Sequence, residues 1–198
     1  ARDTLDILWS LAVMNSMKPD LAEPFLQHTA KLLADERNLT IVNLAKLHQA
    51  LVWYSLEHER KSEECKHLYD KCFSAFTSLP NKLSKFQQGV VSTLLWLGMG
   101  LKQEVFCERT GYSIDAIIVT KEGREVAVEV DGPHHFIDGR IPTGSTALKH
   151  RHLKLGERAF LAIPYWDWYE LNQDPKGQQE YLEKAIARVL SNVNGRSD

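Results

Sequence analysis

Residues 112–136 read YSIDAIIVTKEGREVAVEVDGPHHF, and this stretch decides the fold of the second half of the chain. Isoleucine and valine dominate residues 112–120 and 126–130, which is typical of strands in a mostly buried sheet. The polar segment between them, residues 121–124, contains a glycine and predicts a turn. The stretch therefore predicts two neighbouring strands joined as a hairpin.

The segments after this hairpin alternate between helix and strand. Residues 131–144 are rich in glycine and proline, residues 146–155 have helical spacing, and residues 160–163 form a short apolar run. An amphipathic helix is expected over residues 176–190. Together with a strand at residues 104–108, the order is β-β-β-α-β-α, which a mixed sheet flanked by helices satisfies.

Residues 1–102 are predicted to be helical throughout, because apolar residues recur there at helical spacing. One helix opens at the segment SKFQ, where Ser84 and Gln87 can satisfy each other's backbone amides as a capping box. Leucine-rich positions recur with a period of about 39 residues, as in a stack of helix pairs, although an ordinary helical bundle explains the pattern equally well. The predicted fold class is α+β: an all-α repeat or bundle (1–102), a mixed α/β domain (103–191) and a polar tail (192–198).

Composition excludes several classes of protein. The 198 residues are 43% hydrophobic and 25% charged, with 24 basic and 26 acidic side chains and a net charge of −2. These values are typical of a folded chain, and no apolar stretch approaches the ~20 residues that span a bilayer. Affinity for a polyanion therefore requires a local basic patch. The three cysteines lack CxxC spacing, which argues against a disulfide framework or a zinc site and favours a reducing compartment.

Three carboxylates lie on the two central strands. Asp115 is surrounded by isoleucines, while Glu129 and Asp131 are two residues apart and project to the same sheet face. A charge in such surroundings needs a partner or a cation. Asp115, Glu129 and Asp131 are therefore candidate Mg²⁺ ligands, and with His135 as base they form a candidate catalytic site. The alternative is a turn cap at Asp131 and an arginine partner for Asp115.

This arrangement is similar to that of the restriction-endonuclease-like fold, in which an acid on one strand precedes Glu-x-Lys on the next. Asp131 stands where that pattern has its lysine. Lys149 or His135 would have to replace the lysine if the site is catalytic.

Positive charge is concentrated in residues 140–158. This segment contains five basic residues and one acidic residue, which gives a local charge of +4. The basic residues are Arg140, Lys149, Arg151, Lys154 and Arg158. A phosphate backbone is the natural partner of such a stripe. The aromatic residues that follow could stack on unpaired bases; they are Tyr165, Trp166, Trp168 and Tyr169. A solvated helix face beside an aromatic core is the alternative.

Several ordered blocks in residues 104–190 resemble the RAP domain. The opening block is VEVDGPHHF at residues 128–136, with its His-Phe pair at His135 and Phe136. Later blocks are GSTALKHRHL at residues 144–153, Gly156, and IPYWDW at residues 163–168. Their order and spacing match the family pattern.

The resemblance implies a restriction-endonuclease-like fold, similar to very-short-patch repair endonucleases, and a role in RNA metabolism of mitochondria or chloroplasts. RAP domains typically follow helical repeats, as in the FAST kinase family and octotricopeptide-type proteins, which favours the repeat interpretation of residues 1–102. The prediction is an RNA-binding protein acting in rRNA or mRNA processing, stability or translation. Its candidate RNA-binding residues are Arg140, Lys149, Arg151, Lys154, Tyr165 and Trp168. A Mg²⁺-dependent endoribonuclease and a structural component of an organellar ribosome or ribonucleoprotein are the alternatives.

Overall fold

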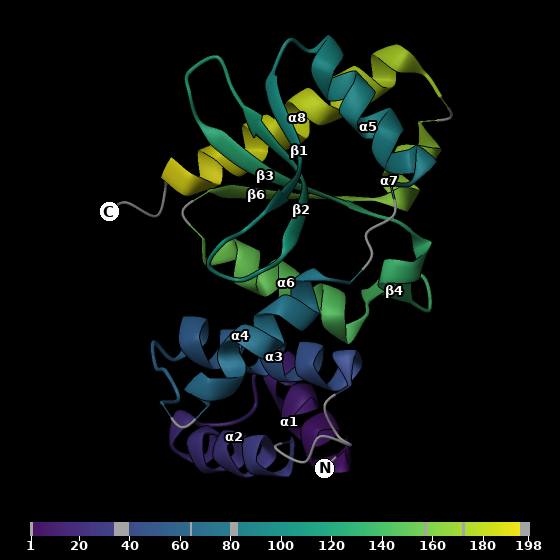
Figure 1. Ribbon diagram of the computed structural model, residues 1–198. Coiled ribbons are helices and arrows are strands. Elements are labelled where there is room, and N and C mark those ends of the chain that lie inside the picture. The colour runs from purple at the N-terminus through teal and green to yellow at the C-terminus, as the bar shows by residue number, and fades with distance from the viewer. Residues whose placement is uncertain are drawn as a thin grey trace. The chain divides into compact units, whose positions relative to one another are not determined.

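The computed structural model describes residues 2–33, 40–63, 65–79, 83–156, 158–171 and 173–194. The chain is an α+β protein, as predicted, with its elements labelled in Figure 1. It forms two compact units and passes between them several times. Unit 1 comprises Ala1–Pro80, Glu108–Gly111 and Ala147–His152; unit 2 comprises Asn81–Cys107, Tyr112–Thr146 and Leu153–Asp198.

The N-terminal part of unit 1 is helical, with α1 (Arg2–Met14), α2 (Pro19–Leu33), α3 (Ile41–Glu57) and α4 (Lys66–Thr77). Helix α3 begins after Thr40, whose side chain accepts a hydrogen bond from the backbone N–H of Asn43. It packs against α1, α2 and α4, and Trp53 on it is fully buried. Helix α3 is therefore the centre of this helical group.

Two later segments of the chain complete unit 1. Gly111 in the first segment has a φ of 71°, and a Cβ on it would lie 3.1 Å from the Phe73 ring, so this position requires glycine. The neighbouring carbonyl of Thr110 accepts a hydrogen bond from His48 Nε2 at 2.8 Å. Leu148 of the second segment is fully buried in the helical core. Unit 1 is thus not formed by N-terminal residues alone.

Unit 2 contains a mixed sheet in the order β1-β2-β3-β6. Its strands are β1 (Gly100–Phe106), β2 (Ser113–Val119), β3 (Glu125–Asp131) and β6 (Ala159–Pro164). Strands β1, β2 and β3 are antiparallel neighbours, as the predicted hairpin requires, and β6 is parallel to β3. Alternate residues such as Ile118, Val128 and Leu161 form the core on one face.

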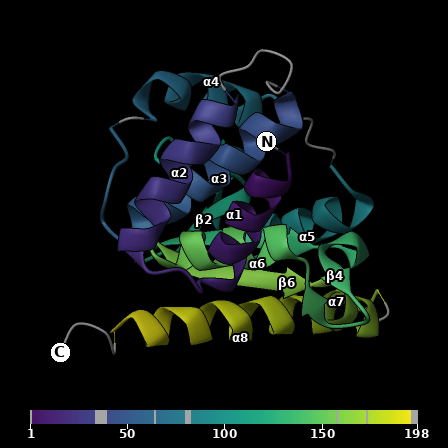
Figure 2. The same cartoon turned by 90° about the horizontal axis from the view of Figure 1, so that it is seen from below.

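Helices α5 (Lys85–Trp96) and α8 (Pro175–Asn194) contribute to this same core. Helix α8 runs along β6 (Figure 2), and α5 contacts α8 and the first three strands. Because α5 packs on the sheet, unit 2 begins near residue 81, whereas the sequence places the boundary near residue 102. Helix α5, which lies within the predicted helical region 1–102, therefore belongs to unit 2.

The connection between β3 and β6 holds two features absent from the predicted element order. A 3-10 helix (Pro133–His135) leads into the small sheet of β4 (Phe136–Ile137) and β5 (Ile141–Pro142). Helix α6 (Gly144–Lys154) follows, and α7 (Tyr165–Glu170) comes directly after β6. The main order β-β-β-α-β-α is otherwise confirmed. In the described part of the chain, no helix is long and apolar enough to cross a membrane.

Candidate nucleic-acid interface

The predicted acidic residues share one face of the sheet. Pairing of Ala116 with Val128 places Asp115 opposite Glu129, and Asp131 follows two residues later. Side chains alternate across a strand, so these carboxylates lie on the face opposite to the core formed with α5 and α8. Glu129 and Asp131 are almost fully buried. The shared face expected from the sequence is therefore present.

The carboxylate of Asp115 accepts hydrogen bonds from other groups of the protein. Its Oδ2 accepts a hydrogen bond from the backbone N–H of Val130 at 2.7 Å, and its Oδ1 accepts one from Gln87 Nε2 at 3.3 Å. The carboxylate thus supplies a backbone N–H with an acceptor just beyond the paired Ala116 and Val128. The hydrogen bond from Val130 explains why an acidic residue is present within an apolar strand. The partner of Asp115 is a backbone amide, whereas the sequence alternative expected an arginine.

Gln87 and Glu104 also belong to this polar group, although no sequence pattern connects them with Asp115. Ser84 caps α5 as predicted, accepting a hydrogen bond from the backbone N–H of Gln87 at 3.0 Å. The Gln87 side-chain amide donates hydrogen bonds to both Glu104 and Asp115. Glu104 has a left-handed backbone with φ of 49°, and its Oε2 accepts a hydrogen bond from Ser113 at 3.3 Å. These contacts join α5, β1 and β2, which no local sequence pattern relates.

The Mg²⁺ site at Asp115, Glu129 and Asp131 stays a prediction from the sequence, and the structure shows how these carboxylates are placed. Among the described residues, no group of three or more His, Cys, Asp or Glu side chains is arranged to hold a metal ion. The three carboxylates share a face, but both oxygens of Asp115 are directed to donors of the protein. Metal-dependent RNA cleavage stays a prediction from the sequence.

His135, the proposed base, connects the end of β3 with the start of α6. Its Nδ1 lies 3.1 Å from Thr146 Oγ1 and 3.6 Å from Asp131 Oδ1. Its carbonyl accepts a hydrogen bond from the backbone N–H of Thr143 at 2.8 Å, and Thr143 Oγ1 lies 2.9 Å from Thr146 Oγ1. These contacts fix the loop between His135 and Thr146, which explains why the two residues occur at this spacing.

Arg151 is the predicted RNA-binding residue whose position differs most from the expectation. Its Nε donates to Glu57 Oε1 at 2.7 Å, and its two terminal nitrogens donate to the carbonyls of Ala12 and Val13. Carbonyls in the last turn of a helix have no intrahelical partner, and they favour a cation. Arg151 therefore caps α1 within unit 1, so its guanidinium is not free to bind phosphate.

Glu57 and His152 complete this buried group. His152 is fully buried at the side chain, with Nε2 3.1 Å from Glu57 Oε1. Burial lowers the pKa of His152 below its ordinary value, and the nearby Glu57 only partly offsets this effect. Burial alone would raise the pKa of Glu57, but its interactions with His152 and Arg151 lower the pKa overall. The group therefore holds an ionised carboxylate, a guanidinium and a neutral imidazole near pH 7.

The other basic residues of the predicted stripe belong to two different units. Lys149 is half-buried and belongs to unit 1 with Arg151, whereas Lys154 and Arg158 belong to unit 2. Lys154 is exposed, with Nζ 5.6 Å from the centre of the Phe160 ring. Arg158 pairs with Glu125 on β3. Two of the five basic residues, Arg151 and Arg158, are therefore paired with acids of the protein.

A continuous row of aromatic rings lies in unit 2, and we call it the aromatic belt; its members are Phe86, Phe136, Tyr165, Trp166, Trp168 and Tyr169. The Trp166 ring on α7 meets Phe136 on β4 at 4.5 Å between ring centres, and these two elements lie side by side (Figure 2). Tyr165 contacts Phe136 at 6.0 Å and Tyr169 at 5.9 Å. The row continues through Phe86, which is 5.6 Å from Tyr169.

The members of the belt differ in exposure. Trp168 is only 6% exposed and packs against Phe86 and Tyr181, so neighbouring residues cover most of its surface, and its role in RNA binding stays a prediction. Tyr165 and Trp166 are half-buried, and Tyr169 is 56% exposed. Tyr169 and Trp166 are therefore better placed to meet a ligand than Trp168.

Two cations accompany the belt. The Arg140 guanidinium lies 5.2 Å from the centre of the Trp166 ring, with its side chain 70% exposed. Its Nη2 is 3.8 Å from Glu170, a loose surface pair that contributes little. Lys85 is exposed beside Phe86, at the other end of the row. The basic segment of the sequence indicates Arg140 but not Lys85, which lies far from it.

The chain is thus an α+β protein with a mixed sheet and an exposed aromatic and cationic surface beside its parallel strand. Residues 128–185 match the RAP domain family. The match begins in β3, ends in α8 and covers less than a third of the chain, and it supports the resemblance found in the sequence blocks. The RAP domain is regarded as an RNA-binding domain, which agrees with rings and cations on this surface.

Proposed function

We propose that the protein binds single-stranded RNA through the aromatic belt, with Arg140 and Lys85 contacting phosphates at its two ends. The observation that carries the proposal is the row of ring contacts that ends at an exposed guanidinium, 5.2 Å from Trp166. Aromatic faces stack on unpaired bases, and cations track the backbone between them. Both kinds of group are present on unit 2 without any contribution from unit 1.

The charge distribution favours unpaired RNA over a duplex. A chain with net charge −2 has little general attraction for the regular phosphate backbone of a helix. Stacking needs bases whose faces are accessible, which only loops, bulges and single strands provide. The belt therefore fits a ligand with unstacked bases.

We also propose a cellular setting, which rests on the resemblance of the sequence blocks to the RAP domain. The protein would act in a mitochondrion or chloroplast, in rRNA or mRNA processing, stability or translation, alone or within a ribosome or ribonucleoprotein. Microscopy of the tagged full-length protein against organelle markers tests this setting. A signal confined to the cytosol or nucleus would refute it.

RNA binding is tested by fluorescence anisotropy with a labelled single-stranded RNA of mixed sequence. Replacing Tyr169 with alanine should weaken binding roughly 5- to 150-fold, the effect of losing one base–aromatic stack of about 1–3 kcal/mol. The matched control is Trp96→Ala, because Trp96 is a more exposed ring of unit 2 that lies outside the belt. Equal affinity of the Tyr169 variant and wild type would contradict the proposal.

Arg140→Ala tests the phosphate contact independently. The slope of log K against log salt should fall by about 0.7, the value for one phosphate contact to a single strand. Lys154→Ala removes an exposed cation of unit 2 outside the belt and should leave the slope unchanged. If both variants reduce the slope equally, any exposed cation contributes in the same way. Arg140 then makes no specific phosphate contact, and its assignment is refuted.

A further inference from the structure

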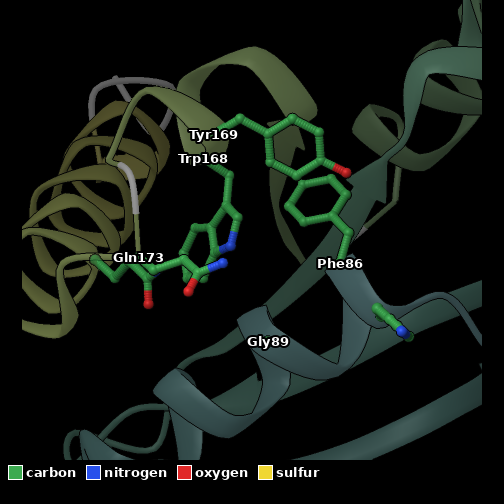
Figure 3. A pocket seen from close by; sticks show the side chains of 7 residues that line it. Phe86, Gly89, Trp168, Tyr169 and Gln173 are labelled. Carbon is green, nitrogen blue, oxygen red and sulfur yellow. The ribbon is translucent and has the colours of Figure 1, made fainter.

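A pocket of about 490 Å³ opens beside the aromatic belt in unit 2 (Figure 3). Its walls are the rings of Phe86, Trp168 and Tyr169, and Gly89 of α5 lies at its base. This volume is in the range of pockets that hold small organic ligands. We name it the α5–α7 pocket after the helices that carry these four residues.

Polar side chains that can form hydrogen bonds with a ligand also line the pocket. Gln173 and Gln178 line the pocket with amides that can both donate and accept hydrogen bonds, and Lys85 adds a cation. No carboxylate is found among its described lining residues. Gln173 has a left-handed backbone with φ of 60°, which is unfavourable for a side chain other than glycine, asparagine or aspartate.

The indole N–H of Trp168 also faces this space. A Cβ built on Gly89 would lie 3.7 Å from Trp168 Nε1, and Figure 3 shows that nitrogen on the side of the ring toward α5. The Trp168 residue is only 6% exposed, and its ring lines the pocket. An indole N–H is a hydrogen-bond donor, so a ligand in the pocket with an acceptor could bind it.

Gly89 keeps the pocket open. It lies in the middle of α5, where glycine is less favourable than alanine. Because a Cβ there would make only ordinary contacts with Trp168, packing does not demand glycine. A larger side chain at this position would instead enter the pocket.

We infer that the α5–α7 pocket holds one unpaired nucleobase of the bound RNA, an inference that rests on the proposed function. Aromatic walls match the faces of a base, and the amides and the indole N–H match the donors and acceptors on its edges. Lys85 matches the phosphate attached to the same nucleotide. Tyr169 belongs to both the pocket and the belt, so the extruded base and its neighbours can follow one continuous surface.

The experiment compares the affinity of Gly89→Leu and of a matched variant, Gln88→Leu, for a single-stranded RNA of about ten nucleotides. Leucine is a good helix former at both positions, but only residue 89 lines the pocket. Gly89→Leu should weaken binding roughly 5- to 150-fold, as expected for one lost base contact, while Gln88→Leu binds as wild type does. Thermal unfolding of both variants checks that the fold is intact.

A second measurement follows the indole N–H resonance of Trp168 in a ¹⁵N spectrum, assigned with the Trp168→Phe variant. RNA should shift this resonance in wild type and in Gln88→Leu but not in Gly89→Leu. An unshifted resonance at saturating RNA would overturn the inference, whatever the affinities.

A third variant, Trp166→Ala, separates this inference from the proposed function. If Trp166→Ala weakens RNA binding and Gly89→Leu does not, the belt binds RNA and the pocket is not a base site. If neither variant weakens binding, the proposed function fails together with the inference. Weakening by both, with the indole shift lost only in Gly89→Leu, is the expected outcome.

Discussion

Replacing Arg151 with alanine should destabilise unit 1 rather than remove an RNA contact. Arg151 donates to the Glu57 carboxylate and to the carbonyls of Ala12 and Val13 at the end of α1. All four residues belong to unit 1, as does the buried Leu148 on the same turn of α6. The arginine therefore holds the α6 segment to the N-terminal helices.

The magnitude follows from what the substitution leaves behind. Removing one partner of a buried ion pair typically costs about 3–5 kcal/mol, because the other charge remains buried. The Glu57 side chain is 6% exposed, but the Arg151 side chain is 29% exposed, so water reaches part of the pair. The lower end of the range, about 3 kcal/mol, is therefore expected. In a chain of this size it corresponds to a fall in Tm of about 6–12 °C.

Urea unfolding followed by circular dichroism measures this change, with Lys154→Ala as the control on the same helix. Lys154 is exposed, so its loss should change the unfolding free energy by less than about 0.5 kcal/mol. Arg151→Lys adds a second comparison, because one ammonium cannot reproduce the planar fork of a guanidinium and should lose most of the stabilisation. If Arg151→Ala weakens RNA binding while its unfolding free energy stays within about 0.5 kcal/mol of wild type, the reasoning is refuted.

Three other properties can be measured on the purified protein. Burial lowers the pKa values of His48 and His152 below 6.5, so the unfolded chain binds more protons just below that pH; urea unfolding should show lower stability at pH 5.5 than at pH 7.5, and equal stability would contradict this. Burial raises the pKa of Cys72 to about 12, so mass spectrometry after alkylation of the native protein at pH 8 should find Cys107 modified and Cys72 intact. Asp115→Ala leaves a backbone N–H of β3 without its acceptor and should cost about 1–3 kcal/mol in urea unfolding, with Asp115→Asn milder; no loss in the alanine variant would argue against the structural role.

The fold class and the order of the main elements could be predicted because they depend on local periodicity. Isoleucine and valine runs predict β2 and β3, and helical spacing predicts α3 and α8. The domain boundary could not be predicted in this way. The apolar face of α5, with Phe86 and Val90, has the same period whether it packs on a helix or on a sheet, and only the structure shows that it packs on the sheet.

The candidate site was predictable in its residue types but not in their partners. The sequence shows five basic residues in one segment, but it cannot show that Arg151 reaches Glu57, 94 positions away. It places Asp115 on the correct face, yet the backbone N–H that binds it lies on another strand. The ring contact between Phe86 and Tyr169 is equally long-range. Long-range pairing decides which charges and rings are available to a ligand, and composition does not contain that information.

The division of the charged residues explains why stacking should supply most of the affinity. A basic segment in a chain of net charge −2 suggests an electrostatic grip, but Arg151 and Arg158 are paired with acids of the protein. The exposed cations beside the belt, Arg140 and Lys85, can neutralise only about two phosphates, which gives weak binding on its own. Each base stacked on an exposed ring adds about as much as a strong polar contact, and it does so without attraction for duplexes. A surface of this kind distinguishes unpaired from paired RNA through the accessibility of base faces, with the cations serving to place the strand along the rings.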